Sequence, residues 1–146
     1  MPANYIIEKA KRYCAYQERS VSEVEKKLYE WKVKSSRVDK IIKILMEENF
    51  LNEERFARLF ASGKFRIKKW GKLKITAQLR AKNIPDNIIH QALKEIDEED
   101  YINALINLME KKKNSLSEPE SLPARKKVLN YMLSRGFENY LVYKYL

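Results

Sequence analysis

The sequence has very few of the residues that make tight turns or covalent cross-links. Its 146 residues include only 3 glycines, 4 prolines and 1 cysteine. Since chain reversals between strands depend on glycine and proline, and this chain is instead rich in Leu, Ile, Lys and Glu, the composition predicts an all-α fold. The lone Cys14 excludes an internal disulfide and is typical of a reducing compartment.

The groups that carry chemistry in enzymes and metal sites are also scarce. The single histidine, His90, has no Cys or His partner at ligand spacing. There is no glycine-rich phosphate loop, nucleophile turn or Cys-x-x-Cys pair. The adjacent carboxylates at 47–48 and 53–54 point in different directions on a helix, which does not suit acid–base catalysis. We therefore expect no enzymatic activity, no cofactor and no metal.

A long apolar run is missing as well. No stretch approaches the ~18 apolar residues that a membrane span requires, and the first residues do not combine a basic segment with a long apolar one, as a signal peptide does. We expect a soluble, cytoplasmic protein that has no membrane partner.

Acidic residues are absent between Glu54 and Asp86, and this absence is the most informative one. The formal net charge is +10, and outside this basic window (residues 55–85) the chain has as many acidic as basic residues. Such a local field attracts polyanions, so a nucleic acid or a protein assembled on one is the expected partner; the alternative is a solvated helix face. The window contains ten basic residues: Arg55, Arg58, Lys64, Arg66, Lys68, Lys69, Lys72, Lys74, Arg80 and Lys82.

A pattern of helix ends is repeated three times along the chain. In each copy a large apolar residue stands five positions before another, and a helix is expected to end between them. Asn83 and Gly136 are suited to the left-handed conformation that ends a helix. The three pairs are Leu28 with Val33, Leu79 with Ile84, and Met132 with Phe137.

Helix-start signals divide the chain in the same way. Helices are expected over about 4–17, 53–69 and 98–113, and the acidic run 97–100 is read as a helix start rather than a metal site. The predicted N-caps are Ser22, which forms a capping box with Glu25, and Ser36, Asn52 and Asp97. Together these signals predict an elongated tandem array of three three-helix units, at 1–51, 52–96 and 97–146, with a flexible linker at about 114–122.

The helical projection of the basic window separates two faces. Phe56, Leu59, Phe60, Gly63 and Ile67 share one side and form the expected core stripe. Phe65 falls among basic residues on the other side, where it is either a stacking ring or covered by a neighbouring unit. Trp70 either packs under the turn or is exposed for binding. The candidate binding residues are Arg55, Arg58, Phe65, Arg66, Lys68, Lys69, Lys72, Lys74, Arg80 and Lys82.

Several segments together resemble the RecX family of recombinase regulators. The segment Phe50-Leu-Asn-Glu-Glu-Arg-Phe-Ala57, followed by Gly71-x-x-x-Ile75-x-x-x-Leu79, carries most of the similarity. The opening Ser22-x-x-Glu25-x-x-Leu28 and the closing Arg135-Gly-Phe137 add to it. The resemblance covers about 20–146, and the chain departs from the family in having Asn83 where glycine is usual.

The resemblance implies a specific function. RecX-like proteins are tandem three-helix modules that bind the RecA filament in its groove, inhibit its ATPase and strand exchange, and also contact single-stranded and double-stranded DNA. It therefore implies a monomeric regulator of DNA recombination, DNA repair and the SOS response. Two alternatives stay open from the residues alone: a helix-turn-helix protein that reads duplex DNA, and a structural adaptor without a nucleic-acid role.

Overall fold

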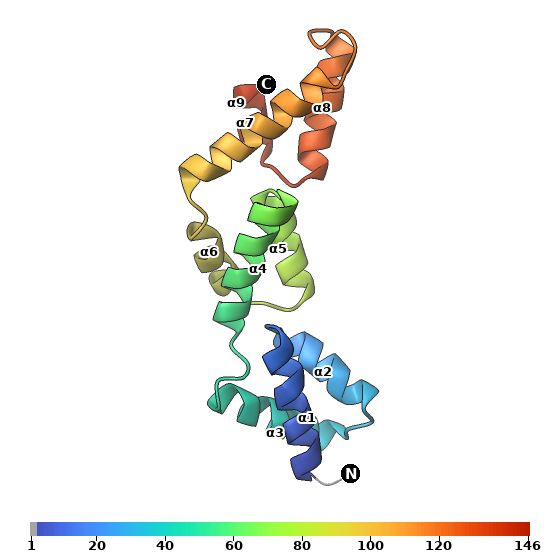
Figure 1. Ribbon diagram of the computed structural model, residues 1–146, viewed down its shortest axis with the longest axis vertical. Coiled ribbons are helices and arrows are strands. Elements are labelled where there is room, and N and C mark those ends of the chain that lie inside the picture. Colours follow the sequence, from blue (N-terminus) through green and yellow to red (C-terminus); the bar gives the residue numbers. More distant parts are fainter. Residues whose placement is uncertain (1–2) are drawn as a thin grey trace.

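The computed structural model describes residues 3–146, which form nine α-helices and no strand. The helices are stacked along one long axis (Figure 1), which confirms the predicted all-α, elongated array. Unit 1 contains α1 (Ala3–Tyr16), α2 (Val21–Glu30) and α3 (Ser35–Glu47). Unit 2 contains α4 (Glu53–Lys68), α5 (Lys72–Ala81) and α6 (Asp86–Lys94). Unit 3 contains α7 (Glu98–Asn114), α8 (Leu122–Ser134) and α9 (Asn139–Tyr145).

The predicted repeat corresponds to one hydrogen bond that recurs in all three units. In each unit the later residue of the pair donates its backbone N–H to the carbonyl of the earlier one, and both side chains are buried. The residue before the later member has positive φ: Lys32 (64°), Asn83 (61°) and Gly136 (93°). The bonds run from Val33 to Leu28 (3.0 Å), from Ile84 to Leu79 (3.1 Å) and from Phe137 to Met132 (3.2 Å).

Two of the predicted N-caps are confirmed. The Asn52 side chain accepts a hydrogen bond from the Arg55 N–H at 2.9 Å, and the Asp97 side chain accepts one from the Asp100 N–H at 2.9 Å. These caps fix the starts of α4 and α7, the first helices of units 2 and 3.

The two predicted caps in unit 1 are wrong. Ser20, and not Ser22, caps α2 by accepting from the Glu23 N–H at 3.2 Å. The pattern Ser-x-x-Glu also occurs at this position, two residues earlier, so two serines compete for the role. Helix α3 begins at Ser35 after Lys34, without a side-chain cap, so Ser36 is already inside the helix.

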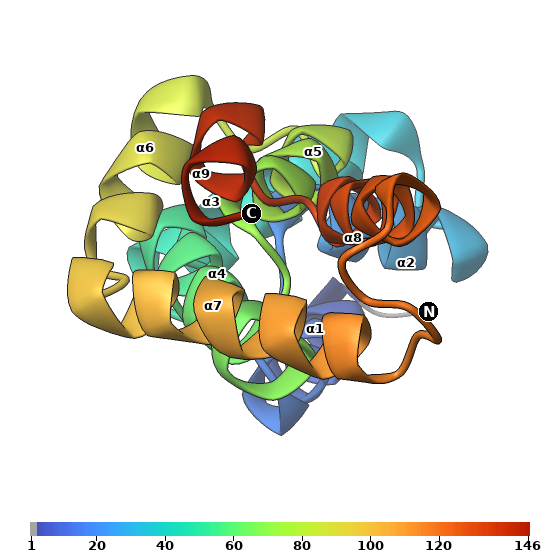
Figure 2. The same ribbon diagram turned by 90° about the horizontal axis from the view of Figure 1, so that it is seen from above.

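The buried residues form two hydrophobic clusters rather than three. One belongs to unit 1 alone and includes Leu28 and Val38. The other is continuous through units 2 and 3, so these two units share one core. Its centre is Tyr101, whose ring lies 5.6 Å from that of Phe65 and 5.3 Å from that of Phe137. Seen along the long axis, α7 passes across α4 (Figure 2). The contact between Phe65 of α4 and Tyr101 of α7 therefore lies at the boundary between units 2 and 3.

The hydroxyl group of Tyr101 also forms hydrogen bonds inside this shared core. Its hydroxyl accepts from the Lys72 N–H at 2.9 Å and donates to the Glu138 carboxylate. Burial, followed by this bond to Glu138, raises the pKa of Tyr101 above the ordinary range of a tyrosine. The phenol therefore stays protonated and holds the start of α5 against unit 3.

The predicted core stripe of α4 is wrong in three of its five positions. Leu59 and Ile67 are 52% and 75% exposed, and a Cβ on Gly63 would meet nothing within 4 Å. The buried side of α4 consists of Phe56, Ala57, Ala61 and Phe65, at the spacing of one helix face. Two of these are small alanines, which a search for the largest apolar side chains passes over.

The segment predicted to be a flexible linker connects α7 to α8 through a series of turns. An ion pair between Lys113 Nζ and Glu120 Oε1, 2.6 Å apart, holds these turns to the end of α7. Ser121 ends the segment as the N-cap of α8, where its hydroxyl accepts from the Ala124 N–H at 3.2 Å.

Candidate nucleic-acid interface

The basic window runs through α4, α5 and the turns that follow them, in the middle unit of the array. Acidic side chains from outside the window reach half of its cations. Arg55 pairs with Glu18, Arg58 with Glu95, Lys72 with Glu98, Arg80 with Asp86, and Lys82 with Glu23. Within residues 3–146 the other five cations have no carboxylate partner: Lys64, Arg66, Lys68, Lys69 and Lys74.

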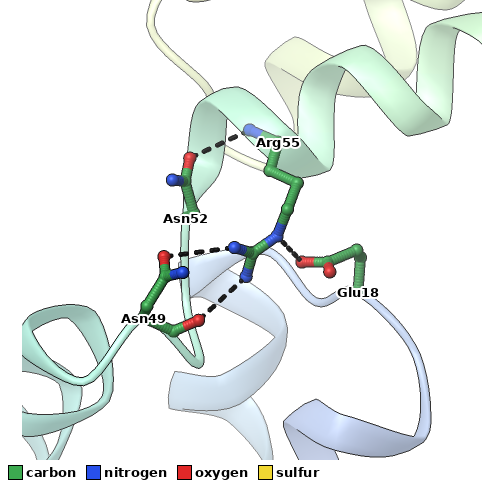
Figure 3. A network of polar contacts seen from close by, with 4 residues as sticks. All are labelled: Glu18, Asn49, Asn52 and Arg55. Atoms are coloured by element: carbon green, nitrogen blue, oxygen red, sulfur yellow. Dashed lines mark hydrogen bonds and ion pairs between the residues drawn. The ribbon is translucent and has the colours of Figure 1, made fainter.

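Arg55 is engaged between units 1 and 2 (Figure 3). Its Nε lies 2.8 Å from Glu18 Oε1, and both atoms are buried. The terminal nitrogens donate to the side-chain oxygen and to the carbonyl oxygen of Asn49, each at 3.1 Å. The guanidinium therefore joins the end of unit 1 to the start of α4, and it is not a free cation of the surface.

Lys82 and Lys72 also join neighbouring units. Lys82 Nζ lies 2.8 Å from Glu23 Oε1 of unit 1, and both side chains are less than one-third exposed. Lys72 Nζ lies 3.5 Å from Glu98 Oε2 of unit 3 and 4.6 Å from the centre of the Tyr101 ring. Three of the ten predicted binding residues, Arg55, Lys72 and Lys82, therefore form ion pairs between units.

The two remaining ion pairs are of a different kind. Arg58 and Arg80 pair with carboxylates of their own unit at 3.8 and 3.0 Å, and every side chain involved is more than half exposed. Exposed pairs of this kind are screened by solvent and contribute little. Both guanidinium groups therefore remain available to a polyanion.

The five cations without a carboxylate partner all lie between residues 64 and 74. They occupy the C-terminal half of α4, the turn after it and the first turn of α5, and a helix C-terminus favours nearby positive charge. Arg135 of unit 3 adds a further cation here, because its guanidinium donates to the carbonyl oxygens of Lys68 and Lys69. The sequence does not reveal this neighbour, because it lies more than 60 residues away along the chain.

The partly exposed aromatic residue that lies among these cations is Trp70 rather than Phe65. Trp70 is half-buried and meets Phe60 edge to face, with ring centres 6.4 Å apart. Lys64 Nζ lies 5.0 Å and Lys74 Nζ 4.8 Å from the centre of the Trp70 ring. Lys64 belongs to the basic window but is not among the predicted binding residues.

The prediction that Phe65 is exposed on the basic face is wrong. The residue is only 7% exposed, and its ring packs against Tyr101 of α7. A single helix projected alone cannot show that the next unit covers one side of it. The alternative, in which a neighbouring unit covers the ring, is therefore confirmed.

Other kinds of site find no support in the described part of the chain. Residues 3–146 contain no group of three or more His, Cys, Asp or Glu side chains arranged to hold a metal ion. None of the helices in this range is both long and apolar enough to cross a membrane. The acidic run at 97–100 lies at the start of α7, as predicted.

Comparison with family models and curated proteins gives a consistent result. The models described as "RecX, second three-helix domain" and "RecX, third three-helix domain" match residues 52–93 and 98–146. A "Regulatory protein RecX" of Prosthecochloris aestuarii is 30% identical over 128 residues, which cover 87% of this chain and 82% of the relative. Another from Lactobacillus johnsonii is 29% identical over 94% of this chain, which spans 51% of that relative. The chain thus spans about half the length of the Lactobacillus relatives it matches.

Two crystal structures share the fold. The structure of RecX from Lactobacillus salivarius superposes with a TM-score of 0.85 at 23% identity, covering 98% of this chain and 93% of that chain. A second, described as regulatory protein RecX, gives 0.82 at 23% identity and covers 95% of this chain and 70% of that chain. The arrangement of nine helices described for residues 3–146 is therefore that of solved structures.

Proposed function

Because this chain belongs to the RecX family of regulatory proteins, we propose that it binds the filament that RecA forms on DNA. In this proposal it lies in the helical groove of the filament and inhibits the RecA ATPase and strand exchange. The observation that carries this proposal is the concentration, at residues 64–74, of five cations that have no carboxylate partner within residues 3–146; they lie on the middle unit of an elongated array. An elongated body suits a groove, and a local positive field suits a target that exposes phosphates.

The DNA part of the interaction follows from the kind of residues present. Lysine and arginine side chains at a helix end contact phosphates without reading the base sequence. We therefore propose contacts to single-stranded DNA, and to duplex DNA with less preference for sequence than a helix-turn-helix protein shows. The protein would act as a cytoplasmic monomer in DNA recombination, DNA repair and the SOS response.

The test is co-sedimentation of the protein with RecA filaments assembled on single-stranded DNA. Parallel samples contain naked single strands and naked duplexes of several sequences, and the RecA ATPase rate is measured on the same filaments. The expected result is binding to filaments, a lower ATPase rate, and weaker binding to naked DNA that does not depend on sequence.

Each competing function gives a different pattern. A helix-turn-helix protein would bind one duplex sequence far more tightly than the others and would leave the RecA ATPase unchanged. A structural adaptor would sediment with neither filaments nor DNA. Either result would overturn the proposal.

A further inference from the structure

The surroundings of Trp70 contain positive charge that nothing in the described chain neutralises. The ammonium groups of Lys64 and Lys74 both approach the same indole ring, at 5.0 and 4.8 Å from its centre. A lysine near an aromatic ring gains about 0.5–1 kcal/mol at an exposed site. Two such groups around one ring repel each other, and within residues 3–146 neither has a carboxylate partner. An anion that arrives between them would relieve this repulsion.

The backbone on both sides of the Trp70 ring is anchored by hydrogen bonds. Lys69 ends α4 in the left-handed conformation, with φ 57°, and the next N–H, that of Trp70, donates back to the Lys64 carbonyl at 3.2 Å. On the other side the Gly71 N–H donates to the Arg135 carbonyl of unit 3 at 2.8 Å. Trp70 is therefore held between two backbone anchors, one in each unit of the shared core.

Lys74 is anchored in the same way at its backbone. Its Cβ would lie only 2.3 Å from a methyl group placed on Gly136, so the start of α5 is pressed against the turn of unit 3. The backbone and Cβ of Lys74 are thus held against unit 3, while its ammonium group lies 4.8 Å from the centre of the indole ring. The three side chains form a small group in which two ammonium groups lie within about 5 Å of the centre of one indole ring.

We propose that Trp70 is a stacking platform for one unpaired base, and that Lys64 and Lys74 bind the phosphates on either side of it. The ligand class is single-stranded nucleic acid, because a base inside a duplex is already stacked and cannot offer its face to a side chain. This inference rests on the proposed function for its biological context, and it assigns the DNA contact of that function to three residues.

The chemistry favours a nucleic-acid strand over an acidic protein segment. A carboxylate from a protein would neutralise the two ammonium groups but would give the indole no flat partner. A nucleotide supplies both parts, since it joins an aromatic base to a phosphate. Trp31 of unit 1 provides a contrast: it is also half-buried and also has one lysine over its ring, Lys9 at 4.3 Å, but it lies outside the basic window.

The two tryptophans make a direct experiment possible. In a Trp31→Phe variant, Trp70 is the only tryptophan, and its fluorescence is followed as an oligo-dT strand is added. We expect the strand to quench the emission, because a stacked base contacts the indole. The matched control is Trp70→Phe, which keeps Trp31 alone and should show no change at the same oligonucleotide concentration.

Affinity measurements test the roles of the three side chains. Trp70→Leu keeps an apolar contact with Phe60 but removes the aromatic face, so it should weaken oligo-dT binding by about 5- to 150-fold. Lys64→Gln and Lys74→Gln should each lower the slope of log affinity against log salt by about 0.7, the value for one lost phosphate contact on a single strand. A strand of the same length with abasic sugars should bind the unaltered protein and the Trp70→Leu variant equally. Circular dichroism confirms that each variant is folded.

Three outcomes would overturn the inference. The first is that the unaltered protein does not bind oligo-dT. The second is that it binds without a change in Trp70 emission and that Trp70→Leu binds equally well. The third is that the Trp70→Leu variant no longer binds RecA filaments but still binds naked oligo-dT, which would assign this surface to a protein partner. In the first two cases the co-sedimentation assay still tests the proposed function separately.

Discussion

A methyl group placed on Gly71 would lie 2.3 Å from the backbone carbonyl carbon of Gly136. The turns that contain these glycines belong to units 2 and 3, and they are also joined by a hydrogen bond from the Leu73 N–H to the Gly136 carbonyl at 2.9 Å. Units 2 and 3 therefore meet through closely packed backbone and a common core. Units 1 and 2 have separate cores and meet through polar groups.

The first prediction concerns this backbone contact. Gly71→Ala should lower the free energy of unfolding by about 1–3 kcal/mol or more, because the new methyl group meets backbone that cannot move aside. The measurement is equilibrium unfolding in urea. Since the contact joins two units, hydrogen exchange should rise in both α5 and the start of α9.

Gly63→Ala is the matched control for Gly71→Ala. Gly63 lies inside α4, and a Cβ there meets open space. Alanine should therefore stabilise the protein by about 0.5–1 kcal/mol through its better helix propensity. Two glycine-to-alanine changes eight residues apart are thus expected to have opposite signs, and a loss of stability in both would contradict the described packing.

The second prediction concerns the joint between units 1 and 2. Arg55→Met leaves a buried oxygen of Glu18 and the side chain of Asn49 without their partner, which should cost about 1–3 kcal/mol. Because the two units have separate cores, the effect should appear in unit 1 more than in units 2 and 3. Hydrogen exchange measured helix by helix would show this difference.

Arg80→Met is the control for Arg55→Met. Its ion pair with Asp86 is more than half exposed on both sides, so stability should change by no more than about 0.5 kcal/mol. Equal losses for the two arginines, or exchange that rises evenly in all three units, would argue against a polar joint at Arg55.

The third prediction concerns Cys14, which is buried in unit 1. Burial raises the pKa of the Cys14 thiol to about 11. The unfolded chain has a thiol pKa of about 8.5, so the folded state holds the proton more tightly. The stability that this pKa difference contributes to the folded state is fully present below about pH 8.5 and is lost as the pH rises toward 11.

The difference in absorbance at 240 nm between the unaltered protein and Cys14→Ala measures this titration, because the nine tyrosines, which also ionise at high pH, contribute to both. In the folded protein it should appear near pH 11, and in denaturant at the lower pH of a free thiol. Cys14→Ala should also remove the part of the pH dependence of stability that the thiol contributes. A titration near pH 8.5 in the folded protein would show that the thiol is accessible to solvent.

The repeat and the fold class could be predicted from the sequence because both depend on local signals. The pairs such as Leu79 with Ile84 lie five residues apart and are joined by a hydrogen bond within one turn. Asn52 and Asp97 cap helices through contacts three residues away. Signals of this length are visible in any single segment of the chain.

The candidate site could be predicted only in outline, because its details depend on contacts between units. The basic window is continuous in sequence, yet Glu23 of unit 1 and Glu98 of unit 3 neutralise two of its lysines. Arg135 joins the interface from a distant turn. A projection of α4 by itself contains no information on these neighbours, and for the same reason it placed Leu59 inside and Phe65 outside.

The last prediction follows from that correction. Phe65→Ala should lower the free energy of unfolding by about 3–5 kcal/mol, because it removes a buried ring that packs on Tyr101 at the boundary of units 2 and 3. Leu59→Ala is the matched control on the same helix. Leu59 is 52% exposed, so its loss should change stability by no more than about 0.5 kcal/mol.

The affinity of the same Phe65→Ala samples for oligo-dT separates packing from binding. Measured under conditions in which the variant is folded, it should equal that of the unaltered protein, because the Phe65 ring is covered by α7 and cannot reach a strand. Weaker binding together with normal stability would mean that the ring is exposed to ligand, as the helical projection had placed it. Large destabilisation together with normal affinity would assign Phe65 to the shared core and leave Trp70 as the aromatic residue of the interface.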